Sequence, residues 1–255
     1  MVDVVYKGVQ MKTVNKDGTT ESPHIERELE FSTFYRLHHW VRVISILVLI
    51  VTGLYLANPF IAPSVTAEPD NFMYALFRSW HVIFGFVAIS MFIGKTYYFF
   101  FVKSDRAEIN SVRDLFCMEN WSKQIGYYML VTRHPKLTGA YNVVQFLAYT
   151  AFYFMMVGLI ITGLILYAHV YHQGLGGMLY EPARYLESMV GGLAVVRDMH
   201  HLLMWGVILF VVVHVYMAVF NAVYGKEGSV DSIISGYKWH DKNNEHKKKY
   251  KCGEK

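Results

Sequence analysis

The sequence predicts an all-α membrane protein, a four-transmembrane-helix bundle with both chain termini in the cytoplasm. Of the 255 residues, 54% are hydrophobic and only 17% are charged, whereas soluble domains carry about 25% charged residues. Four apolar stretches are each about 20 residues long, the length at which a helix crosses a bilayer. The positive charges are also distributed unevenly among the segments that join these stretches.

The four predicted spans cover about residues 38–57, 79–102, 141–168 and 198–224. The first and third are the clearest, and the second and fourth are each interrupted by one polar residue, Lys95 and His214. Four core helices of a large soluble protein are the alternative, but the chain has too few charged residues to coat such a surface.

The basic residues predict the orientation of these spans. Of the 24 Lys and Arg residues, 19 lie before the first span, between the second and third, or after the fourth, and only three lie in or next to the other two loops. The positive-inside rule therefore places the termini and the 103–140 loop in the cytoplasm and the 58–78 and 169–196 loops outside. His169 and His172 are expected in this second outer loop or at a partner interface.

Three regions follow from this orientation. Residues 1–30 are predicted to form a polar cytoplasmic segment, residues 31–240 the membrane domain, and residues 241–255 a basic, flexible tail. No internal repeat is apparent.

Histidines within the predicted spans indicate a functional site, because ionisable groups are costly inside a membrane and are usually kept there for a function. The candidates lie on three spans and are His38 or His39, His81, His200 or His201, and His214. His200 and His214 are 14 residues apart, so they share one helix face and lie about 21 Å apart along the axis. His201 would point to nearly the opposite face from His214.

The direction of each span predicts how these histidines pair. His81 lies level with His200 near the outer surface, and His38 or His39 lies level with His214 nearer the cytoplasm. Imidazole pairs without thiolates or carboxylates suit haem iron with both axial positions filled. We therefore expect two haems that pass electrons. The alternatives are zinc, which needs three or four ligands at one depth, and purely structural histidines.

Basic residues at the same depths are predicted to bind the haem propionates through charge-assisted hydrogen bonds. They are Arg36, Arg42, Arg78, Lys95 and Arg197. Arg78 and Arg197 each lie one helical turn before an outer histidine. The alternative for each side chain is that it extends to the lipid headgroups.

Several segments together resemble one family. They are Arg36-Leu37-His38-His39-Trp40 continuing to Thr52-Gly53, Arg197-Asp198-Met199-His200-His201 with the helix that follows, His214-Val215-Tyr216, and residues 227–237. This combination resembles the b-type cytochrome subunit of membrane-bound nickel–iron hydrogenases over about residues 30–240. The cytochromes b of formate dehydrogenase and thiosulfate reductase share the 14-residue histidine spacing, and residues 227–237 favour the hydrogenase family.

The resemblance implies a ligand set and a function. His39 rather than His38 would pair with His214 for the inner haem, and His81 with His200 for the outer one. The chain would be the electron-transfer subunit of a hydrogen:quinone oxidoreductase complex in the bacterial inner membrane. Hydrogen would be oxidised by partner subunits on the periplasmic side, an iron–sulfur small subunit and a nickel–iron large subunit. Electrons would then cross two haem b groups to membrane quinone.

The quinone site is predicted in the 103–140 loop. Tyr127, Tyr128, Arg133 and His134 would lie there near the cytoplasmic surface, and a histidine can relay protons near neutral pH. A basic loop that faces lipid headgroups is the alternative. Two other functions stay open: a formate dehydrogenase or other periplasmic oxidoreductase as the partner, and a non-redox membrane anchor.

Overall fold

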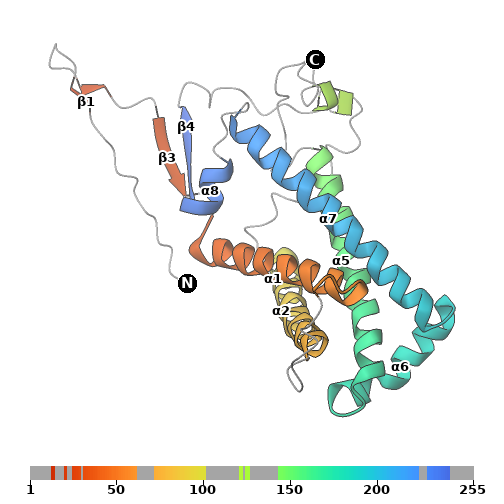
Figure 1. The fold of residues 1–255 in the computed structure, drawn as a ribbon. Coiled ribbons are helices and arrows are strands. Elements are labelled where there is room, and N and C mark those ends of the chain that lie inside the picture. Colours follow the sequence, from red (N-terminus) through yellow and green to blue (C-terminus); the bar gives the residue numbers. More distant parts are fainter. Residues whose placement is uncertain are drawn as a thin grey trace.

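Four long helices dominate the computed structural model (Figure 1). The residues that the structure describes are 13–14, 20–21, 25–29, 31–61, 72–101, 121–122, 124–126, 143–223 and 229–241. The four helices are α1 (Thr33–Ala57), α2 (Met73–Phe101), α5 (Val143–Val170) and α7 (Leu193–Val223). Each is long and apolar enough to cross a membrane, which confirms the predicted bundle of four membrane-spanning helices.

Local signals at the ends of the helix, rather than hydropathy, decide where α1 begins and ends. The Ser32 hydroxyl accepts a hydrogen bond from the Tyr35 amide at 3.2 Å, so α1 begins five residues before the predicted apolar span. It ends at Ala57, just before Asn58 and Pro59, where proline removes a backbone donor. In α1, hydropathy detected only the apolar part of the helix.

The helices pack as two pairs, α1 with α2 and α5 with α7 (Figure 1). Ile46, Met156 and Val207 form a buried cluster where α1, α5 and α7 meet. Many large apolar side chains on the outside of the bundle are exposed. Such a surface is expected of helices whose surroundings are lipid rather than water.

A sixteen-residue helix, α6 (Leu175–Val190), occupies the segment that was expected to be an outer loop. It connects α5 to α7 at one end of the bundle (Figure 1). Ala183 of α6 is buried with Ile165, Ala168 and Val196 of the neighbouring helices. His169 lies in the last turn of α5, and His172 lies just after this helix ends.

Short elements lie at the other end of the bundle, and sequence analysis missed them. Strand β3 (Ile25–Leu29) pairs antiparallel with β4 (Tyr237–Asp241), next to the short helix α8 (Ser229–Ser235) (Figure 1). The two-residue strands β1 (Thr13–Val14) and β2 (Thr20–Glu21) also pair. Partners more than 200 residues apart in the chain leave no local signal in the sequence.

Contacts from α8 hold the first turns of α1. The Phe31 amide donates to the Gly236 carbonyl at 3.1 Å. Arg36 Nη1 donates to the Ile234 carbonyl at 2.6 Å, and Trp40 Nε1 donates to the Ile233 carbonyl at 3.3 Å. The segment that follows α7 is therefore attached to the start of the helix that carries His39.

Candidate cofactor-binding site

His81 of α2 and His200 of α7 face each other at the α6 end of the bundle; we call them the α6-end pair. Their ring centroids are 6.3 Å apart, with the ring planes at 68°. With metal–imidazole bonds of about 2 Å and roughly 1 Å from each nitrogen to its ring centre, two axial imidazoles have centroids about 6 Å apart. The observed separation therefore fits one iron between the two rings.

Each ring of this pair is held by a threonine. Thr52 Oγ1 lies 2.8 Å from His81 Nδ1, and Thr162 Oγ1 lies 2.8 Å from His200 Nδ1. With Nδ1 occupied, Nε2 is the nitrogen left for a metal. Thr162 has no signal of its own in the sequence, and Thr52 stands out there only as part of the Thr52-Gly53 motif.

Glycines let the two rings approach the neighbouring helices closely. A Cβ at Gly53 would lie 3.3 Å from His81 Cε1, and a Cβ at Gly163 would lie 3.3 Å from His200 Cε1. Gly85 lies one turn after His81, and a Cβ there would meet no atom within 4 Å. The glycines behind both rings therefore allow each imidazole to lie directly against the backbone of a neighbouring helix.

The structure reveals a repeat that sequence analysis missed. A Thr-Gly pair on α1 supports the histidine of α2, and a second Thr-Gly pair on α5 supports the histidine of α7. Each supported histidine follows an arginine by three residues, Arg78 before His81 and Arg197 before His200. Too few residues repeat for the sequence alone to show it.

His39 of α1 and His214 of α7 lie nearer the α8 end, and we call them the α8-end pair. The two side chains are close enough to interact electrostatically with each other and with Arg42. The Nδ1 atom of His39 is buried and has no hydrogen-bond partner among the described residues. The ring of His214 is stacked on Phe210, with centroids 5.6 Å apart. A buried imidazole with an unused nitrogen is what a ligand site for iron requires.

The neighbouring His38 has a different environment. Its Nε2 lies 3.0 Å from the Met91 carbonyl of α2, so this ring links α1 to α2. Adjacent helical residues point about 100° apart, and His38 and His39 therefore face different neighbours.

The basic residues predicted to bind propionates are dispersed. Arg36 donates to the Ile234 carbonyl and to Thr33 Oγ1. Lys95 Nζ lies 5.3 Å from the centre of the Tyr35 ring, a cation–π contact. Arg78 and Arg197 are exposed, one turn before the α6-end histidines. Arg42 is within electrostatic range of the α8-end pair.

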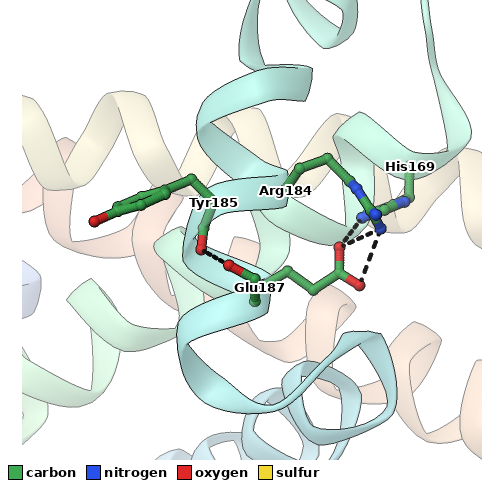
Figure 2. Close-up of polar contacts among 5 residues, drawn as sticks. His169, Arg184, Tyr185 and Glu187 are labelled. Carbon is green, nitrogen blue, oxygen red and sulfur yellow. Dashed lines mark hydrogen bonds and ion pairs between the residues drawn. The ribbon is translucent and has the colours of Figure 1, made fainter.

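An ion-pair cluster at the α6 end was not predicted. Figure 2 shows Glu187 of α6 pointing toward His169 of α5, with Arg184 beside it. His169 Nε2 lies 2.7 Å from Glu187 Oε2, and Arg184 Nη1 lies 3.2 Å from the same oxygen. Glu187 is only 7% exposed. This cluster joins α6 to the end of α5.

The predicted quinone residues Tyr127, Tyr128, Arg133 and His134 lie outside the described residues. Within the part of the chain that the structure describes, His, Cys, Asp and Glu side chains do not form any group of three suited to a metal ion. Four of the histidines described above lie in two pairs, the α6-end pair and the α8-end pair.

Comparison with known proteins identifies the family. The family model described as prokaryotic cytochrome b561 matches residues 30–236, which is most of the chain. The chain belongs to the prokaryotic cytochrome b561 family. This confirms the family resemblance, and membership implies haem b as a cofactor and an integral membrane location.

Curated relatives of this cytochrome b561 have consistent names. A protein of Azotobacter vinelandii, named "Probable Ni/Fe-hydrogenase B-type cytochrome subunit", is 30% identical over 80% of this chain and 85% of its own length. A Rhodobacter capsulatus protein with the same name is 29% identical over 80% and 78%. A protein of Escherichia coli K12, named "Probable Ni/Fe-hydrogenase 1 B-type cytochrome subunit", is 27% identical over 86% and 94%.

Proposed function

We propose that this cytochrome b561 carries electrons across the bacterial inner membrane, from a periplasmic nickel–iron hydrogenase to membrane quinone. The observation that carries the proposal is the α6-end pair, whose centroids are 6.3 Å apart and whose Nδ1 atoms are both occupied by threonines. The names of the curated relatives support the hydrogenase as partner. The chain is the electron-transfer subunit and does not itself activate hydrogen.

Two haem b groups are proposed, one for each histidine pair. Bound haem b supplies reversible one-electron transfer, and an iron with two imidazole ligands has no open position for another reactant. His81 and His200 hold one haem, and His39 and His214 hold the other. The buried, unused Nδ1 of His39 and the engagement of His38 with Met91 support His39 as the ligand.

The protein around these ligands has two tasks, to orient the imidazoles and to exclude water. Ile46, Met156 and Val207 fill the space between the two levels with apolar side chains. His200 and His214 are separated by about 21 Å along α7 at 1.5 Å per residue. The pairs therefore span much of the roughly 30 Å hydrocarbon core, and charge moves along the membrane normal.

The uneven distribution of basic residues supports an orientation with both termini in the cytoplasm. In this orientation the α6 end faces the periplasm, where the iron–sulfur and nickel–iron subunits of the hydrogenase dock. The α8 end then faces the cytoplasm, where quinone is reduced. Inward electron flow with proton uptake from the cytoplasm stores about 2.3 kcal/mol per charge for each 100 mV.

Propionate binding is assigned to basic residues near each pair. Arg42 and Lys95 serve the α8-end haem, and Arg78 and Arg197 serve the α6-end haem. Arg36 contributes at the start of α1, where its contacts to α8 and Thr33 also fix that helix. Quinone binds near the cytoplasmic surface with Tyr127, Tyr128, Arg133 and His134 as its partners.

Haem quantitation with reduced-minus-oxidised spectra tests the function. The purified chain should hold two haem b groups per polypeptide, and His214→Ala and His39→Ala should each retain one. His38→Ala is the matched control and should retain both. A colourless wild-type protein, or a His214→Ala variant with two full haems, would refute the proposal.

Metal analysis of the native complex tests the partner. Nickel that co-purifies with the chain supports a hydrogenase. Molybdenum or tungsten would identify a formate dehydrogenase or a related oxidoreductase as the electron donor instead.

A further inference from the structure

We propose that Thr52 and Thr162 are positioning residues that lower the midpoint potential of the α6-end haem relative to that of the α8-end haem. The inference rests on the proposed function, because it concerns a haem bound by His81 and His200. It adds a reason for electrons to move from one end of the bundle to the other.

The hydrogen bonds at each threonine settle which atom donates. Thr52 Oγ1 lies 2.7 Å from the Val48 carbonyl, and Thr162 Oγ1 lies 2.7 Å from the Gly158 carbonyl. A carbonyl only accepts, so each hydroxyl proton points to the helix backbone. The hydroxyl oxygen therefore accepts a hydrogen bond from the Nδ1–H of its histidine. Both Nδ1 atoms carry the proton, and both Nε2 lone pairs remain for iron.

The glycine after each threonine completes the restraint. Gly53 and Gly163 bring the helix backbone against the Cε1 side of each ring, where a Cβ would lie only 3.3 Å away. The hydroxyl thus fixes the direction of the ring, while the glycine fixes its distance from the helix. The arrangement occurs twice, on two different helix pairs, which indicates a shared requirement rather than a local accident of packing.

In the described part of the chain, the α8-end pair has no such arrangement. Among the residues that the structure describes, neither His39 nor His214 has a threonine hydroxyl at Nδ1, and His39 Nδ1 has no partner at all. A hydrogen bond from the second ring nitrogen makes the imidazole a stronger electron donor to the metal. Stronger donation stabilises ferric over ferrous iron. The two threonines therefore lower one potential and leave the other unchanged, so electrons run downhill from the α6 end to the α8 end.

Redox titration of purified holoprotein tests this inference. In Thr52→Val and Thr162→Val the side chain keeps its branched shape and loses its hydroxyl. We expect one of the two midpoint potentials to rise in both variants, with a shift in the low-spin ferric EPR signal of the same haem. A His200→Ala variant, which keeps only the α8-end haem, identifies which potential belongs to which site.

Three further substitutions serve as controls. Thr52→Ser and Thr162→Ser keep the hydroxyl and should return the potential toward the wild-type value. Thr150→Val removes a hydroxyl that donates to the Phe146 carbonyl, 12 residues or about 18 Å along α5 from Thr162. It should leave the α6-end potential unchanged.

The inference fails if neither valine variant moves the α6-end potential, or if serine and valine move it equally. If the valine variants lose this haem, haem retention becomes the measurement. Retention in the serine variants then supports the positioning role. Loss in both the serine and the valine variants indicates an effect of packing alone and overturns the inference. Failure of the proposed function would look different, because the wild-type protein would then lack a haem with two histidine ligands.

Discussion

At the scale of single residues, adjacent histidines on α1 have different tasks. His38 turns toward α2, where its Nε2 contacts the Met91 carbonyl, and His39 turns inward with a buried, unused Nδ1. In the sequence the two histidines are equivalent candidates, because they are adjacent and lie at almost the same depth in the predicted span. Only the surrounding helices distinguish them, since one position faces a backbone carbonyl and the other faces a second histidine.

The space next to an axial histidine gives a prediction at this scale. In Gly163→Val a side chain would enter the region where even a Cβ lies 3.3 Å from His200 Cε1. We expect the ring to be displaced and the α6-end haem to be lost, so that haem content falls from two to one per chain. Haem extraction and visible spectra measure this.

The matched control is Gly206→Val on α7. A Cβ at Gly206 would collide with the Met155 sulfur, the mobile part of a flexible side chain that can move aside. This variant should keep both haems. Equal haem loss in the two variants would mean that general overpacking of the bundle, rather than displacement of the His200 ring, causes the loss.

At the scale of elements, α6 depends on one buried carboxylate. Glu187 accepts from His169 of α5 at 2.7 Å and is almost fully buried, while the apolar residue Ala183 packs against α5 and α7. Without a partner, a buried polar group is costly. The ion pair thus fixes the position of a helix whose outer residues Met178, Tyr185 and Met189 are exposed.

Removal of this carboxylate should loosen α6. Glu187→Ala leaves His169 without its hydrogen bond, so we expect the free energy of unfolding to fall by about 1–3 kcal/mol. Faster proteolytic cleavage between α5 and α7 should accompany the loss. Thermal unfolding and limited proteolysis in detergent measure both effects.

Glu181→Ala on the same helix is the comparison, because Glu181 is exposed and its removal should change stability by less than about 0.5 kcal/mol. If both variants unfold alike, the buried ion pair does not anchor α6.

At the scale of the whole molecule, the histidine pairs connect the two halves of the bundle. Direct packing joins α1 to α2 and α5 to α7. His81 and His39 belong to the first half, whereas His200 and His214 belong to the second. Each haem would therefore bridge the halves, in addition to the buried cluster of Ile46, Met156 and Val207.

Haem binding should consequently stabilise the assembled bundle. A ligand at 1,000 times its Kd stabilises a protein by about 4 kcal/mol, so the haem-depleted chain should unfold at a lower Tm than the holoprotein. The Tm of His200→Ala should lie between these two values, and the Tm of the adjacent His201→Ala should equal that of the wild type. Calorimetry or circular dichroism gives the order, and identical Tm values for the holo and haem-depleted forms would contradict it.

Part of this architecture could be predicted from local pattern. The four spans follow from apolar runs of about 20 residues, and the His200–His214 spacing follows from the helix period. By contrast, α6 was missed because its apolar residues alternate with polar ones and so do not form the continuous apolar run that marks a span. The pairing of β3 with β4 was missed because the two strands are far apart in the chain.

The sequence by itself determined the class of protein, the number of spans, the family and the histidines worth testing, because each of these is carried by composition or by residues close together in the chain. Only the tertiary structure decided which nitrogen each histidine presents, which neighbour holds it, and that Thr52 and Thr162 have matching positions. Those properties arise where different helices touch. Contacts between residues that are far apart in the chain produce no recognisable pattern in the sequence around either residue.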